Sequence, residues 1–187
     1  LAEIFYVMAN ALSNQNNYEL SNFYINLAKY LNPNFFSFDS LLAENFYNLK
    51  KIEKSKNIYR RLSNTGSFYK WYAYKQVALI LDEQKREEES YNLLSKAYQS
   101  INPTVYETFD YANFLRDREK YEESIELYSK ILFQIKKDHK IYSRVLDRRG
   151  TAYERISNWD LAEKDLLMSL KISPNQPYVM NYLAYSW

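Results

Sequence analysis

The feature that most constrains this chain is an internal repeat with a period of about 34 residues. A small residue recurs at spacings of 34, 35, 34, 38 and 34, at Ala9, Ala43, Ala78, Ala112, Gly150 and Ala184. A bulky residue follows three positions after each of them, at Leu12, Phe46, Leu81, Leu115, Tyr153 and Trp187. Periods of roughly 20–50 residues are typical of proteins that stack one supersecondary unit many times. The chain is therefore expected to be a repeat array.

Each period contains two segments with apolar residues at helical spacing and a short polar break between them. The first helices are expected at residues 2–14, 36–48, 70–83, 105–117, 142–156 and 177–187. The second helices are expected at residues 18–31, 52–64, 87–100, 121–136 and 159–172. Breaks such as "SNQNN" and "RDREK" are short enough to make the two helices of a pair antiparallel.

Composition supports an all-α fold. The 187 residues include only two glycines and four prolines, and a sheet protein needs more of both for its tight turns. Pro33, Pro103 and Pro174 fall just after second helices, where a residue that cannot continue a helix is expected.

These markers resemble the tetratricopeptide repeat (TPR), a helix–turn–helix unit of about 34 residues, and are similar to those of long multi-repeat bacterial TPR proteins. The fifth repeat matches best, at Gly150, Tyr153, Trp159, Ala162, Leu166, Ile172 and Pro174. The resemblance implies a right-handed α-solenoid of antiparallel helix hairpins that forms one domain over residues 1–187. Its repeats would span about 2–35, 36–69, 71–104, 105–142 and 143–176, with a partial sixth repeat at 177–187.

Three local departures carry further expectations. The spacing of 38 before Gly150 predicts a longer second helix or a longer exit loop in the fourth repeat. Arg149 stands where the repeat normally has an apolar residue. The chain lacks an initiator methionine and stops at Trp187 within an apolar pattern, so a fragment of a longer protein is expected. Apolar surface near Leu183 would then be exposed and would support further repeats or self-association.

Catalytic, metal-binding and cofactor-binding residues are not predicted. The chain has no cysteine and one histidine, His139, in "KKDHK", where a solvated position is expected. Neither Gly66 nor Gly150 lies in a glycine-rich phosphate loop, so Gly150 is interpreted as a helix-crossing residue. Carboxylates such as Glu87, Glu88 and Glu122 begin second helices and fit the helix dipole. The chain is therefore expected not to be an enzyme.

Net charge and hydropathy limit the classes of partner that the sequence predicts. A formal net charge of +2 gives no overall field toward nucleic acid or anionic lipid. No apolar run is long enough to span a membrane. A chain without thiols suits either the bacterial cytoplasm or the periplasm, so the sequence leaves the compartment open.

The TPR resemblance implies that first helices line a concave face and that ligand contacts recur at fixed positions of each repeat. At these positions the chain has a mixture of tyrosines and polar or charged residues, which is typical of protein-recognition sites. They are Tyr6, Asn10, Asn14, Glu44, Tyr47, Asn48, Tyr72, Lys75, Asp82, Tyr106, Phe109, Asn113, Arg116, Arg144, Asp147, Thr151, Arg155, Tyr178 and Asn181. Ser40, Leu79, Glu154 and Tyr185 occupy further positions of the same set.

The sequence thus predicts a non-enzymatic scaffold that binds a peptide segment or a partner protein in a concave groove. The lysine and asparagine pair with which some TPR proteins hold a terminal carboxylate is absent, because Lys75 is followed by Leu79. Two alternatives stay open: an RNA-binding helical-repeat module, and the targeting arm of an enzyme whose catalytic domain lies outside these residues.

Overall fold

The computed structural model describes the backbone of residues 1–186, together with their side chains except those of residues 67, 68, 185 and 186. The predicted position of Trp187 in the last helix and the predicted groove contact of the Tyr185 side chain lie outside this described part. Contacts divide the chain into two compact units, Leu1–Asn102 and Pro103–Trp187.

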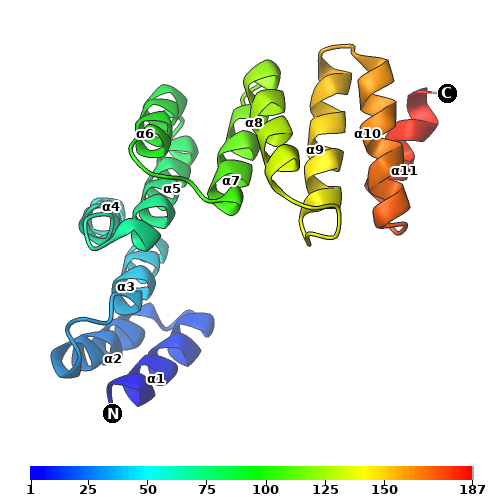
Figure 1. Cartoon of the computed structure of the whole chain (residues 1–187). Helices are drawn as coiled ribbons and strands as arrows, with labels where there is room; N and C mark the ends of the chain where they lie inside the picture. The colour runs from blue at the N-terminus through cyan, green and yellow to red at the C-terminus, as the bar shows by residue number, and fades with distance from the viewer. Residues whose placement is uncertain (187) are drawn as a thin grey trace. The chain divides into compact units, whose positions relative to one another are not determined.

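The first unit contains three helix pairs that follow one another along the chain (Figure 1). They are α1 (Ala2–Asn14) with α2 (Tyr18–Leu31), α3 (Ser37–Asn48) with α4 (Ile52–Leu62), and α5 (Ser67–Glu83) with α6 (Glu87–Gln99). Each helix packs against the next one, and α1 also contacts α3. A continuous buried core follows these contacts, with Ile25, Phe38 and Leu62 among its most buried side chains.

The second unit contains two further pairs and a last helix. They are α7 (Val105–Arg116) with α8 (Tyr121–Gln134), α9 (Tyr142–Arg155) with α10 (Trp159–Ile172), and then α11 (Pro177–Ser186). Successive helices pack together, and α7 contacts α9 (Figure 1). The predicted all-α fold of antiparallel helix hairpins is confirmed, whereas a single domain over residues 1–187 stays a prediction.

Each hairpin turn in the described residues rests on one residue in the left-handed backbone region. These residues have φ of 60° or 61° and are Asn16, Lys50, Lys85, Glu119 and Ser157. In the α7–α8 turn the Glu119 amide donates to the Arg116 carbonyl (2.9 Å), and the Lys120 amide donates to the Leu115 carbonyl (3.0 Å). This is the Schellman pattern of helix termination. Because none of the five residues is glycine, the chain forms its hairpins with few glycines.

The small residues of the first five repeats are buried where paired helices cross, whereas Ala184 on the unpaired α11 is exposed. Ala9 is fully buried, and the Ser21 hydroxyl of α2 donates to its carbonyl at 2.8 Å. At Gly150 an ideal Cβ would lie 2.9 Å from Leu166 Cγ and 3.2 Å from the carbonyl oxygen of Ala162. The interpretation of Gly150 as a helix-crossing residue is confirmed.

The irregular features of the sequence have local explanations. Helix α5 begins at Ser67, three residues before its predicted start at Lys70. Helix α8 ends at Gln134, so the extra residues of the fourth repeat lengthen the connection to α9 rather than the helix. Arg149 is accommodated at its normally apolar position because it forms two hydrogen bonds with Asp165 (2.6 and 2.9 Å) and one with the Ser129 hydroxyl (2.9 Å).

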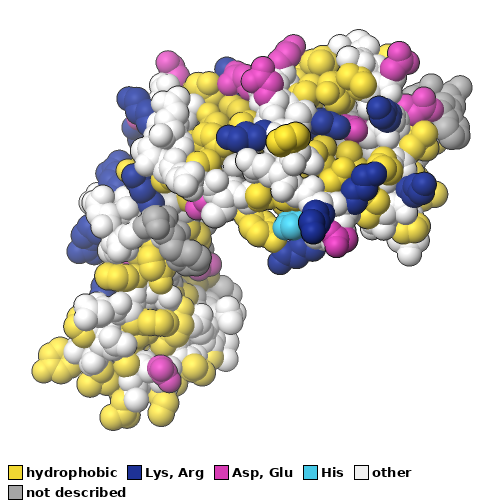
Figure 2. All heavy atoms as spheres, viewed as in Figure 1, with side chains coloured by type: hydrophobic (Ala, Val, Ile, Leu, Met, Phe, Trp, Pro, Cys, Tyr) yellow, Lys and Arg dark blue, Asp and Glu magenta, His cyan; other side chains and the backbone are white. Residues whose placement is uncertain are grey.

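His139 lies in the α8–α9 connection and is half-buried, so the expected solvated position is wrong. The Ile141 amide donates to its Nδ1 (3.4 Å), and the ring centroid lies 6.0 Å from that of Tyr106. Figure 2 shows basic side chains in dark blue beside the cyan histidine. One of the neighbouring cations is Lys140, whose Nζ lies 5.4 Å from the Tyr106 centroid.

Candidate functional site

A hollow of about 380 Å³ lies between first helices in the first unit and is here called the α3–α5 hollow. Five residues at predicted groove positions line it: Glu44, Tyr47, Asn48, Tyr72 and Leu79. The remaining lining residues are Tyr59, Gln76, Ile80 and Glu83. Helices α3 and α5 supply almost the whole lining, as expected for a surface made by first helices.

Tyrosines form a rigid wall of the α3–α5 hollow. The ring centroids of Tyr59 and Tyr72 are 6.2 Å apart in an edge-to-face arrangement, and the Tyr72 hydroxyl lies 2.7 Å from the Ser40 hydroxyl. Burial raises the pKa of Tyr59, and Tyr72 and the negative charge of Glu44 raise it further. The Tyr59 side chain therefore contributes a neutral phenol to this wall.

The charged lining residues of this hollow are both acidic. Glu44 and Glu83 are exposed, and neither forms an ion pair within the described part of the chain. Lysine, arginine and histidine are absent from the lining. Outside the lining, Lys50 Nζ lies 6.0 Å from the centroid of the Tyr47 ring.

A second hollow, of about 320 Å³, lies on first helices of the second unit and is here called the α7–α9–α11 hollow. The predicted residues Arg116, Thr151, Arg155 and Tyr178 line it. The other lining residues are Asp117, Glu119, Tyr121, Arg148 and Tyr182.

Arginines in this second hollow are each paired with a neighbouring acid. Arg116 Nη2 lies 2.6 Å from Asp117 Oδ1, and Arg155 Nε lies 3.5 Å from Glu154 Oε2. Arg148 Nε lies 3.8 Å from Asp147 Oδ2. The hollow is therefore close to charge balance, in contrast to the α3–α5 hollow.

Asp147 and Thr151 were predicted as groove contacts, and the structure places both among the buried residues. Burial raises the pKa of Asp147, against the opposing effects of Arg148 and Arg116. Its Oδ1 is buried without a hydrogen-bond partner among the described residues. Thr151 still contributes to the α7–α9–α11 hollow, but its hydroxyl donates to the Arg148 carbonyl at 2.9 Å.

Several other predicted residues interact within the fold. The Tyr6 ring packs 5.1 Å from Phe38 of the next repeat, and the Asn10 amide donates to the Tyr6 carbonyl at 3.2 Å. Asn113 accepts a hydrogen bond from the buried Tyr128 hydroxyl at 2.8 Å. These side chains position the helices that carry the surface.

The remaining predicted residues lie outside the two hollows. Phe109 packs 6.0 Å from Tyr128, and the Arg144 guanidinium lies 5.8 Å from the Phe109 centroid. Tyr106 is 44% exposed on α7. Lys75 and Asp82 are half-buried on α5, whereas Asn14 and Asn181 are exposed.

Sequence reasoning missed some lining residues that helical spacing could have found. Gln76 and Glu83 follow Tyr72 and Leu79 by four positions, and residues four apart share one helix face. Arg148 follows the predicted Arg144 by the same step. Tyr59 and Tyr121 come from second helices, so a pattern restricted to first helices does not include them.

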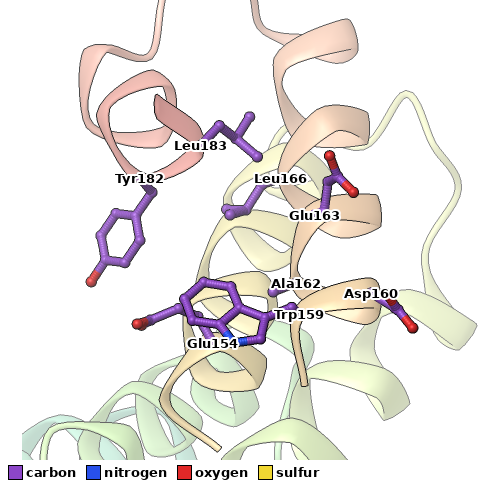
Figure 3. A pocket seen from close by; sticks show the side chains of 8 residues that line it. All are labelled: Glu154, Trp159, Asp160, Ala162, Glu163, Leu166, Tyr182 and Leu183. Atoms are coloured by element: carbon purple, nitrogen blue, oxygen red, sulfur yellow. The ribbon is translucent and has the colours of Figure 1, made fainter. Parts of the chain in front are cut away.

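A smaller pocket of about 100 Å³ lies where α11 packs against the fifth repeat (Figure 3). Leu183 points toward Leu166 there, and Trp159 lies beside Glu154. The expected exposure of Leu183 is wrong, because α11 packs onto α10 and leaves this side chain 5% exposed. Tyr178 and Met180 are the exposed large side chains of α11.

Residues 1–186 show neither a metal-binding cluster nor a membrane-spanning helix. Among the side chains described there, no group of three or more His, Cys, Asp or Glu residues is placed to hold a metal ion. None of the helices in that range combines the length and apolar character needed to cross a bilayer.

Comparison with known proteins places the fold. No protein-family model and no curated protein matches the sequence. Among solved structures, YrrB, described as a TPR protein with an unusual peptide-binding site, superposes with a TM-score of 0.63 at 13% identity, over 96% of this chain and 90% of YrrB. The chain has the tetratricopeptide-repeat fold.

Other TPR structures agree. The C-terminal part of a TPR repeat-containing protein from Cytophaga hutchinsonii has a TM-score of 0.61 at 15% identity, over 91% of this chain and 65% of that chain. TPR-like repeats of a putative kinesin light chain from Podosopora anserina have a TM-score of 0.64 at 9% identity, over 91% and 93% of the two chains. At these identities the likeness concerns the TPR fold.

Proposed function

We propose that this TPR chain is a non-enzymatic interaction scaffold that binds a peptide segment of a partner protein on its first helices. The observation that carries the proposal is that predicted contact residues gather in two hollows of about 380 and 320 Å³. Each hollow combines tyrosine rings with polar side chains, a composition enriched in protein-recognition surfaces.

The dimensions of the hollows fit side chains of a bound segment. Peptide and ligand pockets have volumes of roughly 300 Å³ and above, and a few aromatic anchors supply most of the affinity. The solved TPR structure of YrrB is described as having a peptide-binding site, which makes a peptide the natural ligand class to test.

RNA binding receives no support from the α3–α5 hollow, because Glu44 and Glu83 would repel phosphate groups there. The α7–α9–α11 hollow pairs its arginines with carboxylates, which reduces their attraction for a nucleic-acid backbone. A peptide or a protein segment is therefore the proposed partner.

Selection from a random peptide library on the 187-residue chain tests the function. The peptides recovered are then measured against two variants, Tyr47→Ala in the α3–α5 hollow and Tyr178→Ala in the α7–α9–α11 hollow. We expect at least one variant to weaken its peptides by about tenfold or more, the usual effect of removing an aromatic anchor.

Matched controls come from exposed aromatics outside both hollows. Tyr30 on α2 is 87% exposed and Phe133 on α8 is 93% exposed. Tyr30→Ala and Phe133→Ala should leave the affinities unchanged, and circular dichroism should show unchanged helicity for all four variants. The function would be refuted by a library that yields no binder, or by binders that respond equally to hollow and control variants.

A further inference from the structure

We infer that the α3–α5 hollow recognises a cationic side chain, arginine or lysine, of a bound peptide. The inference rests on the proposed scaffold function and specifies the partner chemistry of one of its two hollows. It requires that Glu44 and Glu83 act on the ligand rather than on the protein itself.

The carboxylates of the α3–α5 hollow have no cationic partner in its lining and can therefore pair with a ligand. Its lining holds two carboxylates and no lysine, arginine or histidine. Two exposed glutamates of the same unit are neutralised locally, since Glu53 lies 2.6 Å from Lys56 and Glu89 lies 2.6 Å from Arg86, whereas Glu87 and Glu88 are exposed on α6 outside the hollow. Within the described residues, Glu44 and Glu83 have no such partner.

The tyrosines supply a second attraction for a cation. Lysine and arginine are attracted to the faces of aromatic rings, and Tyr47 already lies 6.0 Å from the Nζ of Lys50. Tyr59 and Tyr72 line the same space and add their aromatic rings to it. A long cationic side chain could therefore place its methylene groups against these rings while its charge meets a carboxylate.

The hollow also offers the hydrogen-bond acceptors and apolar surface that such a side chain needs. The amide oxygens of Asn48 and Gln76 are additional acceptors, and an arginine guanidinium has five N–H donors. Leu79 is 51% exposed at the edge and can contact an apolar neighbour in the peptide. We do not expect this preference in the α7–α9–α11 hollow, because three arginines line it and Arg116 already pairs with the Asp117 carboxylate.

Three capped peptides test the inference on the full chain. All three have leucines at the same positions. Between the leucines the first peptide has two arginines, the second has two glutamines and the third has two glutamates. Affinity is measured by fluorescence anisotropy, and the bound site is located by amide chemical shifts of α3 and α5.

We expect the arginine peptide to shift these amides and to bind about fivefold or more tightly than the glutamine peptide, the effect of one or two partly exposed ion pairs. This advantage should shrink as salt is raised. In the double variant with Glu44→Gln and Glu83→Gln it should disappear. Glu87→Gln with Glu88→Gln is the matched control, because it removes the same charge from exposed positions of α6 outside the hollow, and it should keep the preference.

Two results would overturn the inference. One is absence of amide shifts in α3 and α5 with the arginine peptide. The other is binding of the glutamine or glutamate peptide at this hollow as tightly as the arginine peptide; peptide binding would then stand while the cationic preference falls. Failure of the scaffold function itself is recognised separately, by the random-library selection that yields no binder.

Discussion

Replacing Gly150 by alanine adds one methyl group that has two opposing effects on stability. The new Cβ would lie 2.9 Å from Leu166 Cγ and 3.0 Å from its Cδ2. Leu166 is 3% exposed, so its side chain has no solvent to move into. Overpacking of this kind costs about 1–3 kcal/mol. Alanine in a helix interior is favoured over glycine by about 1 kcal/mol.

The net expectation for Gly150→Ala is a loss of between about 0 and 2 kcal/mol in the free energy of unfolding. Gly150→Leu should lose about 3 kcal/mol or more, because the larger side chain also meets the carbonyl oxygen of Ala162, 3.2 Å from the Cβ position. Urea unfolding followed by circular dichroism measures both.

A double-mutant cycle isolates the steric contact. Leu166→Ala alone should cost about 2–5 kcal/mol because it leaves a cavity. In that background the contacts with Leu166 Cγ and Cδ2 are gone and only the 3.2 Å contact with the Ala162 carbonyl oxygen remains, so the same substitution should now be neutral or stabilise by up to about 1 kcal/mol. Ala112→Gly, at a fully buried equivalent crossing, is the control and should lose about 1 kcal/mol or more. Effects that add within about 0.5 kcal/mol would refute the proposed contact between residues 150 and 166.

Three further predictions concern a turn, an ion pair and a buried carboxyl. Lys85 has φ of 61°, so Lys85→Gly should raise stability by about 0.5–1 kcal/mol in urea unfolding; a decrease would contradict this. The side chains of Arg149 and Asp165 are 20% and 8% exposed, so Asp165→Ala should lower the free energy of unfolding by roughly 3–5 kcal/mol, because it leaves the arginine charge unpaired. The double variant Arg149→Met with Asp165→Leu should lose clearly less. Equal losses in the two variants would argue against the ion pair. Burial raises the pKa of Asp147, so the stability of the fold should fall as pH rises above about 3.9, the pKa of an aspartate in the unfolded chain. Asp147→Asn should flatten this fall and be more stable than the original chain at pH 7. An unchanged dependence of stability on pH in the variant would contradict this prediction.

The fold was predictable because its constraints recur at fixed intervals. Ala9 and Gly150 occupy equivalent crossings more than a hundred residues apart; Ala9 is fully buried, and at Gly150 even a methyl group would meet the partner helix. The start of α5 was not predictable from this register. The second repeat lacks the proline that follows the second helices of the first, third and fifth repeats, and Gly66, with φ of 156°, provides the break from which α5 begins.

The location of the candidate site on the first helices was predictable from the sequence, but the role of each single residue was less so. The contact positions implied by the TPR resemblance include Glu44, Tyr47 and Tyr72 on first helices, and these three line one hollow. The same positions include Tyr6 and Asn113, whose side chains contact Phe38 and Tyr128. Which groove position faces a partner and which one packs depends on the neighbouring helix, and a repeat pattern contains no information about that neighbour.

The two hollows show where a repeat protein is free to vary its chemistry. Crossing positions accept only small residues, because the helices would otherwise separate, and this restricts their sequence in every repeat. Glu44 and Glu83 meet no such restriction, since they are exposed and have no ion-pair partner within the described residues. The arginines of the second unit occupy comparable surface positions but are neutralised by adjacent acids such as Asp117. Because the charge of a hollow can change without altering the crossings, we expect partner preference to reside in these exposed side chains and stability to reside in the repeated small ones.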